Sequence, residues 1–321
     1  MSTGGDATGT ARAAQASACP ACGGATTHPF GHDGGRFHVV VCDRCGLGRT
    51  VPQPSDAELR ALYAGDYQSA DARKFSSRVE RARRFFARAL VRRIVRRAGR
   101  GGRALDVGCG DGKLLTALIA QGYEGTGTEL NPRIGETAPK GATIVVGTLE
   151  DAHLPAHSQR VVVMRHVLEH VRDPRGTVRE LRRVIADDGC LVIGVPNLAS
   201  WQARVARERW FHLDLPRHLF HFTPASLTML LESEGFRIER VSHLSFDQNP
   251  YGWLQSALNM LGGRWAGLYD QLRSEGARNA RALDPMAAAL GALITPLSVV
   301  LTGIEAAAHA GGTVEVWARP R

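Results

Sequence analysis

Between residues 101 and 247, the pattern of hydrophobic and polar residues switches repeatedly between the one typical of strands and the one typical of helices. Short apolar runs with the composition of buried strands alternate with segments whose apolar residues recur at the spacing of an amphipathic helix. The expected strands are 104–107, 125–129, 143–146, 161–164, 191–195 and 238–244, and the expected helices are 113–121, 171–185 and 225–234. Because alternating strands and helices form an open sheet with helices on both faces, we predict a doubly wound α/β domain over residues 101–247.

The chain after this domain carries a long apolar segment and then a last strand. Residues 248–312 contain two apolar stretches with helical character, 253–268 and 286–304, and the second lacks charge but includes Pro296. Residues 313–321 then alternate like an edge strand. Since a membrane span would have to return the chain to the sheet for this strand, we expect a C-terminal helical insertion that acts as a lid or lies on a membrane surface.

The chain before the domain divides into three parts. Residues 1–17, rich in Gly, Ala, Ser and Thr, have the composition of a disordered tail. Residues 18–50 contain two pairs of cysteines, and residues 51–100 are expected to form a helical connector. Within the connector, residues 73–97 have an apolar face at helical spacing, and arginines fill the opposite face.

The large net charge of the chain says little about its binding partners. The formal net charge is +9, and only three of the 40 basic residues are lysines, so the excess reflects an arginine bias as much as a binding surface. We therefore expect the arginines of 73–97 to be solvated, and we do not expect nucleic acid as a partner. Because no secretion signal precedes the cysteine pairs, we expect a cytoplasmic protein, with peripheral contact at the inner face of the membrane as the alternative.

Four of the six cysteines fall into two C-x-x-C pairs that flank a strand-like stretch at 36–41. This layout is typical of a zinc ribbon, in which four thiolates complete a closed tetrahedral shell with no open position for chemistry. We therefore predict a structural zinc ion over residues 18–50, bound by Cys19, Cys22, Cys42 and Cys45.

The first expected strand of the α/β domain runs directly into a glycine-rich loop, LDVGCGDG at 105–112. Such a loop lets the backbone approach a ligand closely, and Glu129 at the end of the next strand is placed to bond both hydroxyls of an adenosine ribose. The glycines are spaced more tightly than in a dinucleotide-binding loop, which suits a ligand without a pyrophosphate. Loop and acid together predict a site for S-adenosylmethionine (SAM).

Two further segments are expected beside this cofactor. After the third strand, Glu150 is preferred over Asp151 as the acid that accepts from the adenine amine. At the end of the fourth strand, His166 is expected to face SAM or the substrate, whereas Glu169 and His170 are expected only to begin the following helix. The residues expected to bind the cofactor are Asp106, Gly108, Cys109, Gly110, Gly112, Glu129, Leu130, Leu149, Glu150 and Arg165.

Several motifs give the chain a family resemblance. They are Cys42-x-x-Cys45-Gly46-Leu47, the 105–110 loop, Val167-Leu168-Glu169-His170, and DLPRHLFHFT at 214–223. With these motifs the chain resembles bacterial class I SAM-dependent methyltransferases of the methyltransferase-23 type that carry an N-terminal zinc ribbon. The resemblance implies a seven-stranded methyltransferase sheet, one bound SAM, and methyl transfer to an acceptor that varies among members.

Candidate residues for the acceptor site follow the fifth strand. Methyl transfer from a sulfonium is an in-line displacement, so a base is needed only if the acceptor must lose a proton. His218 and His221, together with His166, are candidate catalytic residues, and Arg217 could hold an anionic group of the acceptor. Alternatively, residues 216–222 cover the edge of the sheet, and their histidines are simply hydrogen-bonded.

Three functional hypotheses follow. The first is an enzyme that methylates an oxygen or carbon atom of a small-molecule, glycan or lipid-linked acceptor, with membrane contact through residues 248–312. The second is a zinc-ribbon RNA methyltransferase, although the ribbon has few aromatic residues for stacking on bases. The third is a non-catalytic SAM-binding or zinc-scaffold protein, against which the intact loop and acid argue.

Overall fold

The computed structural model describes residues 18–68, 77–132, 138–262 and 285–321. Its main sheet has seven strands in the order β10-β11-β8-β7-β4-β5-β6. The strands are β4 (Gly102–Val107), β5 (Tyr123–Glu129), β6 (Ala142–Val146), β7 (Gln159–Arg165), β8 (Ile185–Pro196), β10 (Phe236–Ser242) and β11 (Thr313–Pro320). Strands β6, β5, β4, β7 and β8 pair in parallel, and β11 runs antiparallel to both β8 and β10. The predicted seven-stranded α/β fold is confirmed.

The last strand is where the prediction was wrong. Strand β11 is not at an edge, because it is inserted between β8 and β10, and β10 is the edge strand. The alternation that suggested an edge comes from Glu315, which is itself only 5% exposed. Its carboxylate accepts hydrogen bonds from Arg93 and from the indole of Trp317, so a polar residue is accommodated on a strand that is buried on both faces.

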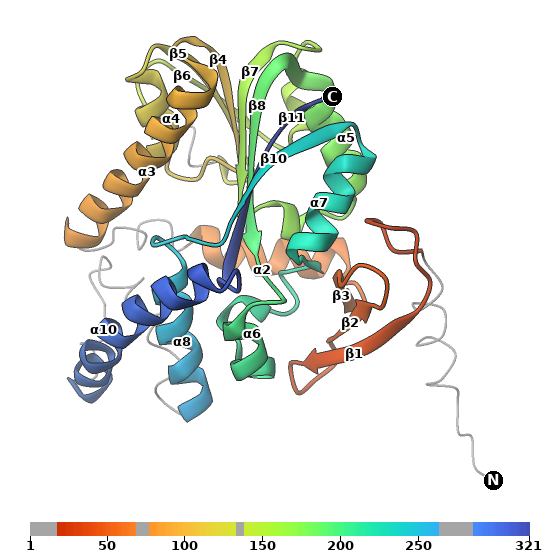
Figure 1. The fold of residues 1–321 in the computed structure, drawn as a ribbon, viewed down its shortest axis with the longest axis vertical. Helices are drawn as coiled ribbons and strands as arrows, with labels where there is room; N and C mark the ends of the chain where they lie inside the picture. The colour runs from red at the N-terminus through yellow and green to blue at the C-terminus, as the bar shows by residue number, and fades with distance from the viewer. Residues whose placement is uncertain (1–17, 69–76, 133–137, 263–284) are drawn as a thin grey trace.

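Helices cover both faces of the sheet (Figure 1). On one face lie α3 (Ser77–Ala98) and α4 (Lys113–Ile119), whose apolar residues pack with Trp317 and the inner strands. On the other face lie α5 (Pro174–Val184) and α7 (Pro224–Ser233). Two arginines of α3, Arg93 and Arg97, lie over the ring of Trp317. The arginine-rich segment therefore forms the expected packed helix, and part of its charge holds the sheet rather than facing water.

The N-terminal residues form a second, smaller sheet. It contains β1 (Thr27–His32), β2 (His38–Cys42) and β3 (Gly48–Val51), all antiparallel, and its fourth strand is β9 (Phe220–His221) from the methyltransferase-like half of the chain. A side chain at Gly48 would collide with His221 and Leu198, so glycine permits this close pairing. The predicted ribbon is thus continued by part of the segment 216–222.

The remaining helices lie below the carboxyl ends of the central strands in Figure 1. They are α2 (Asp56–Gln68), α6 (Trp201–Ala206), α8 (Asn249–Leu261) and α10 (Pro285–Ala307), with the short 3-10 turns η3 (Glu150–Ala152), η4 (Leu168–His170), η5 (Arg207–Arg209) and η6 (Phe211–Leu213). Helices α8 and α10 pack against each other and correspond to the two expected apolar helices, although residues 263–268 of the first lie outside the described part.

One buried carboxylate fastens the α8–α10 pair to the sheet. Glu305 of α10 accepts hydrogen bonds from the Trp253 indole, the Gln202 amide and the backbone N–H of Gly312, which immediately precedes β11. Among the described helices none is long and apolar enough to cross a membrane.

Candidate active site and structural metal site

A cavity of about 1430 Å³ opens at the carboxyl ends of β4, β5 and β7. Its walls come from the loops after these strands and after β6, and from α2, α3, η6, and the first turns of α4, α5 and α8. Parallel strands of an open sheet bring their loops together at this edge, so residues that are distant in sequence meet there. Eight of the ten residues expected at the cofactor line the cavity, namely Asp106, Gly108, Cys109, Glu129, Leu130, Leu149, Glu150 and Arg165.

The glycine loop after β4 has a backbone that only glycine adopts easily. Gly108, Gly110 and Gly112 have φ angles of 70°, 52° and 70°, in the left-handed region. A side chain at Gly108 would lie 2.3 Å from Val167, and one at Gly112 would lie 2.5 Å from Pro139. Gly110 and Gly112 do not themselves line the cavity. Their contribution is to shape the turn that brings the backbone of Gly108 and Cys109 to the cavity wall.

Glu129 is oriented by the loop that it faces. Its Oε2 atom accepts the backbone N–H of Gly110 at 3.0 Å, and its Oε1 atom accepts the N–H of Asn131 at 3.1 Å. These bonds fix the carboxylate at the cavity wall, and each oxygen retains a second lone pair. The site therefore fits an adenosine ribose, whose two neighbouring hydroxyls need two acceptors on one rigid group.

The carboxyl group of Asp106 lies deeper, at the end of β4. Burial raises its pKa to about 7, although Arg165 opposes that shift. At neutral pH a substantial fraction of this side chain is therefore protonated and can donate a hydrogen bond.

The loop after β6 contains Glu150 and Asp151, the two acids that were candidates to bind the adenine amine, and the structure gives them different surroundings. Asp151 accepts hydrogen bonds from the backbone N–H and the hydroxyl of Thr148, at 2.7 and 2.9 Å. This turn occupies Asp151 within the loop. Glu150 and the buried Leu149 line the cavity instead, which is the arrangement that an adenine amine and ring would require.

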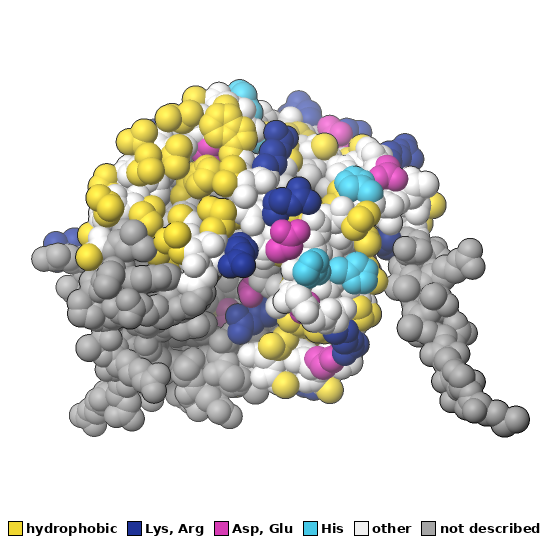
Figure 2. Space-filling view, turned by 90° about the horizontal axis from the view of Figure 1, so that it is seen from below, with side chains coloured by type: hydrophobic (Ala, Val, Ile, Leu, Met, Phe, Trp, Pro, Cys, Tyr) yellow, Lys and Arg dark blue, Asp and Glu magenta, His cyan; other side chains and the backbone are white. Residues whose placement is uncertain are grey.

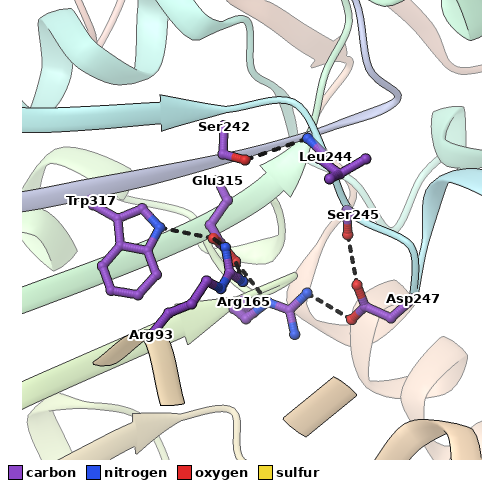
Figure 3. A network of polar contacts seen from close by, with 8 residues as sticks. All are labelled: Arg93, Arg165, Ser242, Leu244, Ser245, Asp247, Glu315 and Trp317. Carbon is purple, nitrogen blue, oxygen red and sulfur yellow. Dashed lines mark hydrogen bonds and ion pairs between the residues drawn. The ribbon is translucent and has the colours of Figure 1, made fainter. Parts of the chain in front are cut away.

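Arg165 pairs with two acids, Asp247 and Glu315, that lie outside the glycine loop. Figure 3 shows its guanidinium between Asp247 and Glu315; Nη2 donates to Asp247 at 2.7 Å, and Nε lies 4.0 Å from Glu315. Burial raises the pKa of Asp247, but the charge and hydrogen bond of Arg165 outweigh it and lower that pKa to about 2. Arg165 therefore holds the segment after β10 against the sheet, although part of its side chain lines the cavity.

Histidines gather beside the end of β7, and in the order of the strands β4 and β5 separate them from Glu150, which follows β6. His166 follows β7 with a φ of 55°, unusual for a residue other than glycine, and its Nε2 atom is buried without a hydrogen-bond partner among the described residues. His212 and His218 line the same region. The Nδ1 atom of His218 bonds the carbonyl oxygen of His212 at 2.8 Å, and burial lowers the pKa of His212 to about 3.

His221 does not reach this cavity. It lies in β9, where it is 3% exposed, and its Nε2 atom is 3.1 Å from the hydroxyl of Thr50 in the ribbon. Burial, followed by the charge of His218, lowers the pKa of His221 to about 3, so the ring is neutral. Of the segment 216–222, the structure brings Arg217 and His218 to the cavity, with Arg217 3.8 Å from Asp214. For His221 the geometry supports the alternative given in the sequence analysis, in which the segment covers the sheet and its histidine is simply hydrogen-bonded.

Several residues of the cavity wall were not expected from the sequence. Glu169 and His170, interpreted as a helix start, line the cavity in η4 and are followed by α5 only at Pro174. Others are Arg83 and Phe86 of α3, Phe211 and His212 of η6, and Gln248 and Tyr251 at the start of α8. These residues come from connector, turn and insertion, where the local sequence carries no periodic signal of a site.

The four cysteines of the two pairs converge as expected for zinc. The Sγ atoms of Cys19 and Cys45 are 3.5 Å apart, as are those of Cys22 and Cys42, and all four lie within 4.8 Å of one another. Tetrahedral ligands at the usual zinc–sulfur distance of about 2.3 Å would be about 3.8 Å apart. The cysteines therefore fit a structural zinc ion with little movement.

Hydrogen bonds join the turns that carry the two cysteine pairs to the main domain. Arg175 of α5 donates to the carbonyl oxygen of Pro20, and Thr223, the N-cap of α7, donates to that of Cys45. Cys19, Cys42 and Cys45 also belong to the same apolar core as the main sheet. Ribbon and sheet therefore pack as one body through α5, α7 and β9.

Comparison with known proteins agrees with this geometry. A family model described as a methyltransferase domain matches residues 79–241, about half of the chain. A ubiquinone biosynthesis O-methyltransferase of Xanthomonas axonopodis pv. citri is 29% identical over 161 residues, covering 46% of this chain and 67% of the relative. The Xylella fastidiosa (strain 9a5c) protein of the same name is 30% identical, covering 46% and 65%. A solved SAM-dependent methyltransferase of Archaeoglobus fulgidus is 18% identical, with a TM-score of 0.47, and covers 74% of this chain and 94% of its own.

Proposed function

This chain belongs to the family of SAM-dependent methyltransferases whose domain matches residues 79–241, and we propose that it transfers the methyl group to a hydroxyl oxygen of a small, apolar or lipid-linked acceptor. The observation that carries the proposal is one cavity lined both by Glu129, the acid at the end of β5, and by a group of imidazoles beside the end of β7, with β4 between these two strands. The names of the relatives from ubiquinone biosynthesis support O-methylation of a small molecule.

The donor end of the cavity is assigned to SAM. In this proposal Glu129 accepts from both ribose hydroxyls, Glu150 accepts from the adenine amine, and the backbone at Gly108 and Cys109 lies along the methionine part. Asp106, whose pKa is near 7, donates to or accepts from the same part. SAM supplies a methyl group on a positively charged sulfur atom.

The acceptor end holds the hydroxyl that is methylated. Its O–H bond breaks and the proton passes to an imidazole nitrogen of His166 or His218, both of which line the cavity. The oxygen lone pair forms the new O–CH₃ bond, while the electrons of the C–S bond return to sulfur and leave a neutral thioether. Because the displacement is in line, most of the acceleration comes from holding oxygen, methyl carbon and sulfur in a row. Arg217 is placed to hold an anionic group of the acceptor.

Helix α10 supports an acceptor or a surface that is apolar. Leu293, Leu297, Val300 and Ile304 recur at helical spacing and are 76%, 57%, 58% and 50% exposed. Figure 2 shows hydrophobic side chains gathered on this face of the molecule, with basic residues beside them. Exposed apolar patches of this kind mark sites of interaction, and basic residues beside them suit anionic lipid headgroups. We propose that α8 and α10 rest on a membrane surface while the first turn of α8 walls the cavity.

Methyl transfer is tested with SAM labelled in its methyl group and an extract of the source cells, separated afterwards into lipid, small-molecule, glycan and RNA fractions. We expect label in the lipid or small-molecule fraction as an alkali-stable methyl ether. Replacement His218→Gln should lower the rate about 10²- to 10⁴-fold, because it removes an imidazole that can take the proton or position the acceptor. The exposed His157→Gln serves as the matched control and should leave the rate unchanged. Label confined to RNA, or absent from every fraction, contradicts the proposal.

Membrane contact is tested by sedimentation with vesicles of phosphatidylglycerol and phosphatidylcholine. We expect Leu297→Glu to weaken binding about tenfold or more, because burial of one leucine side chain contributes about 1.5–3 kcal/mol. Val146→Glu makes the same kind of change on the exposed edge strand β6, at the other end of the sheet, and should have no effect. Equal binding of both variants and the unmodified protein would rule out contact through α10.

A further inference from the structure

Three side chains converge at the acceptor end of the cavity. Glu169 and His170 lie in η4, and His218 lies 48 residues further along the chain. One ligand atom from each residue lies within 4.8 Å of the other two, and all three side chains line the cavity. We propose that Glu169, His170 and His218 bind a divalent transition-metal ion that holds the hydroxyl group of the acceptor. The catalytic part of this inference rests on the methyl transfer proposed above, whereas binding of the ion rests on geometry alone.

The carboxylate of Glu169 is the first argument for a cation. The residue is 1% exposed, and neither of its oxygens has a hydrogen-bond partner among the described residues. The Nδ1 atom of His166 lies 3.6 Å from Oε1, which is too long for a hydrogen bond. A buried carboxylate that accepts no hydrogen bond costs several kcal/mol even with an imidazole 3.6 Å away, so proteins hydrogen-bond such groups or use them to coordinate metals.

The two imidazoles are oriented as metal ligands usually are. The Nδ1 atom of His170 bonds the carbonyl oxygen of Arg217 at 3.1 Å, and that of His218 bonds the carbonyl oxygen of His212 at 2.8 Å. A carbonyl oxygen only accepts, so Nδ1 carries the proton in both rings, and Nε2 is the nitrogen with the lone pair. A backbone carbonyl on the far ring nitrogen is the contact that fixes tautomer and orientation in metal-binding histidines.

The spacing of the ligand atoms also fits an ion. Three ligands bound symmetrically at about 2.1 Å are at most about 3.6 Å apart, so movements of at most about 0.7 Å each would bring the three atoms to one centre. Two imidazoles and one carboxylate form a set that leaves several coordination positions open and suits ions such as Mn²⁺, Fe²⁺, Co²⁺ or Zn²⁺. An open position facing the cavity can take the oxygen of the acceptor.

This site differs in kind from the cysteine site of the ribbon. Four thiolates form a closed shell that selects zinc, whereas carboxylate and imidazole ligands also accept Mn²⁺. An ion between Glu169 and His218 would stabilise the negative charge that develops on the acceptor oxygen as its proton leaves. In this arrangement His218 is a ligand, and His166 remains as the imidazole that can accept the proton.

The test uses the zinc-loaded full chain and Mn²⁺ as the probe, followed by electron paramagnetic resonance. We expect one Mn²⁺ per chain, with spin-echo modulation from imidazole nitrogen. Glu169→Gln and His218→Gln should each weaken binding about 100-fold, because each removes a ligand. His166→Gln should retain Mn²⁺ but lose methyl transfer. Glu232→Gln, the same change at an exposed position of α7, should alter neither.

Zinc content and circular dichroism of each variant show whether it is folded. The spin-echo modulation from imidazole nitrogen is measured in the unmodified protein and therefore does not depend on the folding of any variant. A wild-type protein that binds no Mn²⁺ at millimolar concentration, or that binds it without imidazole modulation, would overturn the inference. Unchanged affinity in the folded Glu169→Gln and His218→Gln variants would do the same. If methyl transfer proceeds without the ion, this inference fails and the proposed function stands. If the ion binds but no acceptor is methylated, the proposed function fails and the metal site stands.

Discussion

Replacement of Glu129 by alanine should lower the affinity for SAM at least about 100-fold. A hydrogen bond to a charged group contributes about 1.5–3 kcal/mol, and the two ribose hydroxyls would lose one each. The substitution also removes the acceptor that holds the N–H of Gly110, so the glycine loop loses its support at the same time. Isothermal titration of SAM into both proteins measures the effect.

Glu124→Ala is the matched control for this experiment. Glu124 lies on the same strand, β5, but at the other end, where it is exposed and forms an ion pair with Arg103 at 3.5 Å. It should bind SAM as the unmodified protein does. Equal SAM affinity in Glu129→Ala and Glu124→Ala would mean that the acid at the end of β5 does not bind the ribose.

Loss of one zinc ligand should have the second large effect. In Cys42→Ser we expect loss of the zinc ion and a decrease in stability of at least about 4 kcal/mol, roughly 10 °C in melting temperature. Because β3 pairs with β9, and β9 directly follows His218 and Leu219, an unfolded ribbon would also displace His218 from the cavity. Methyl transfer should therefore fall along with zinc content.

The control for the ribbon is Cys190→Ser, which makes the same change at a buried cysteine of β8. This variant should keep its zinc ion and most of its activity. Zinc is measured by atomic absorption and stability by thermal unfolding. A Cys42→Ser protein that retains a full complement of tightly bound zinc would contradict the four-thiolate site, and one that loses zinc but keeps full activity would separate the ribbon from the active site.

The sequence predicted the fold wherever a local pattern determines the structure. Apolar runs located the strands of the main sheet to within two residues, except that β8 begins six residues before the expected 191, and the paired cysteines located the ribbon. The position of β11 could not be predicted in this way, because its polar residue, Glu315, is buried against Arg93 of α3. Likewise, no pattern near β9 indicates that its two residues extend a sheet whose other strands lie within residues 27–51. Both depend on contacts between distant parts of the chain.

The residues of the candidate site likewise fall into those that a local pattern predicts and those that depend on contacts between distant parts of the chain. Glu129 and the glycine loop could be predicted because both follow adjacent strands and their chemistry is local. Arg165 was expected at the cofactor, but its partner Asp247 comes from the segment before α8, which no motif identifies. Glu169 could be interpreted as an ordinary helix start because the sequence does not show that its carboxylate is buried without a hydrogen bond from the described residues. The residues around the acceptor therefore become apparent only when the folded cavity is seen.

The most direct test of the account is a crystal structure of the protein with S-adenosylhomocysteine, the product left when SAM loses its methyl group. The account predicts that the ribose hydroxyls bond Glu129, that the adenine lies beside Leu149 and Glu150, and that the sulfur atom faces the histidines at His166 and His218. A ligand bound elsewhere, or bound here with its sulfur directed away from those histidines, would contradict the proposal that donor and acceptor meet in this cavity.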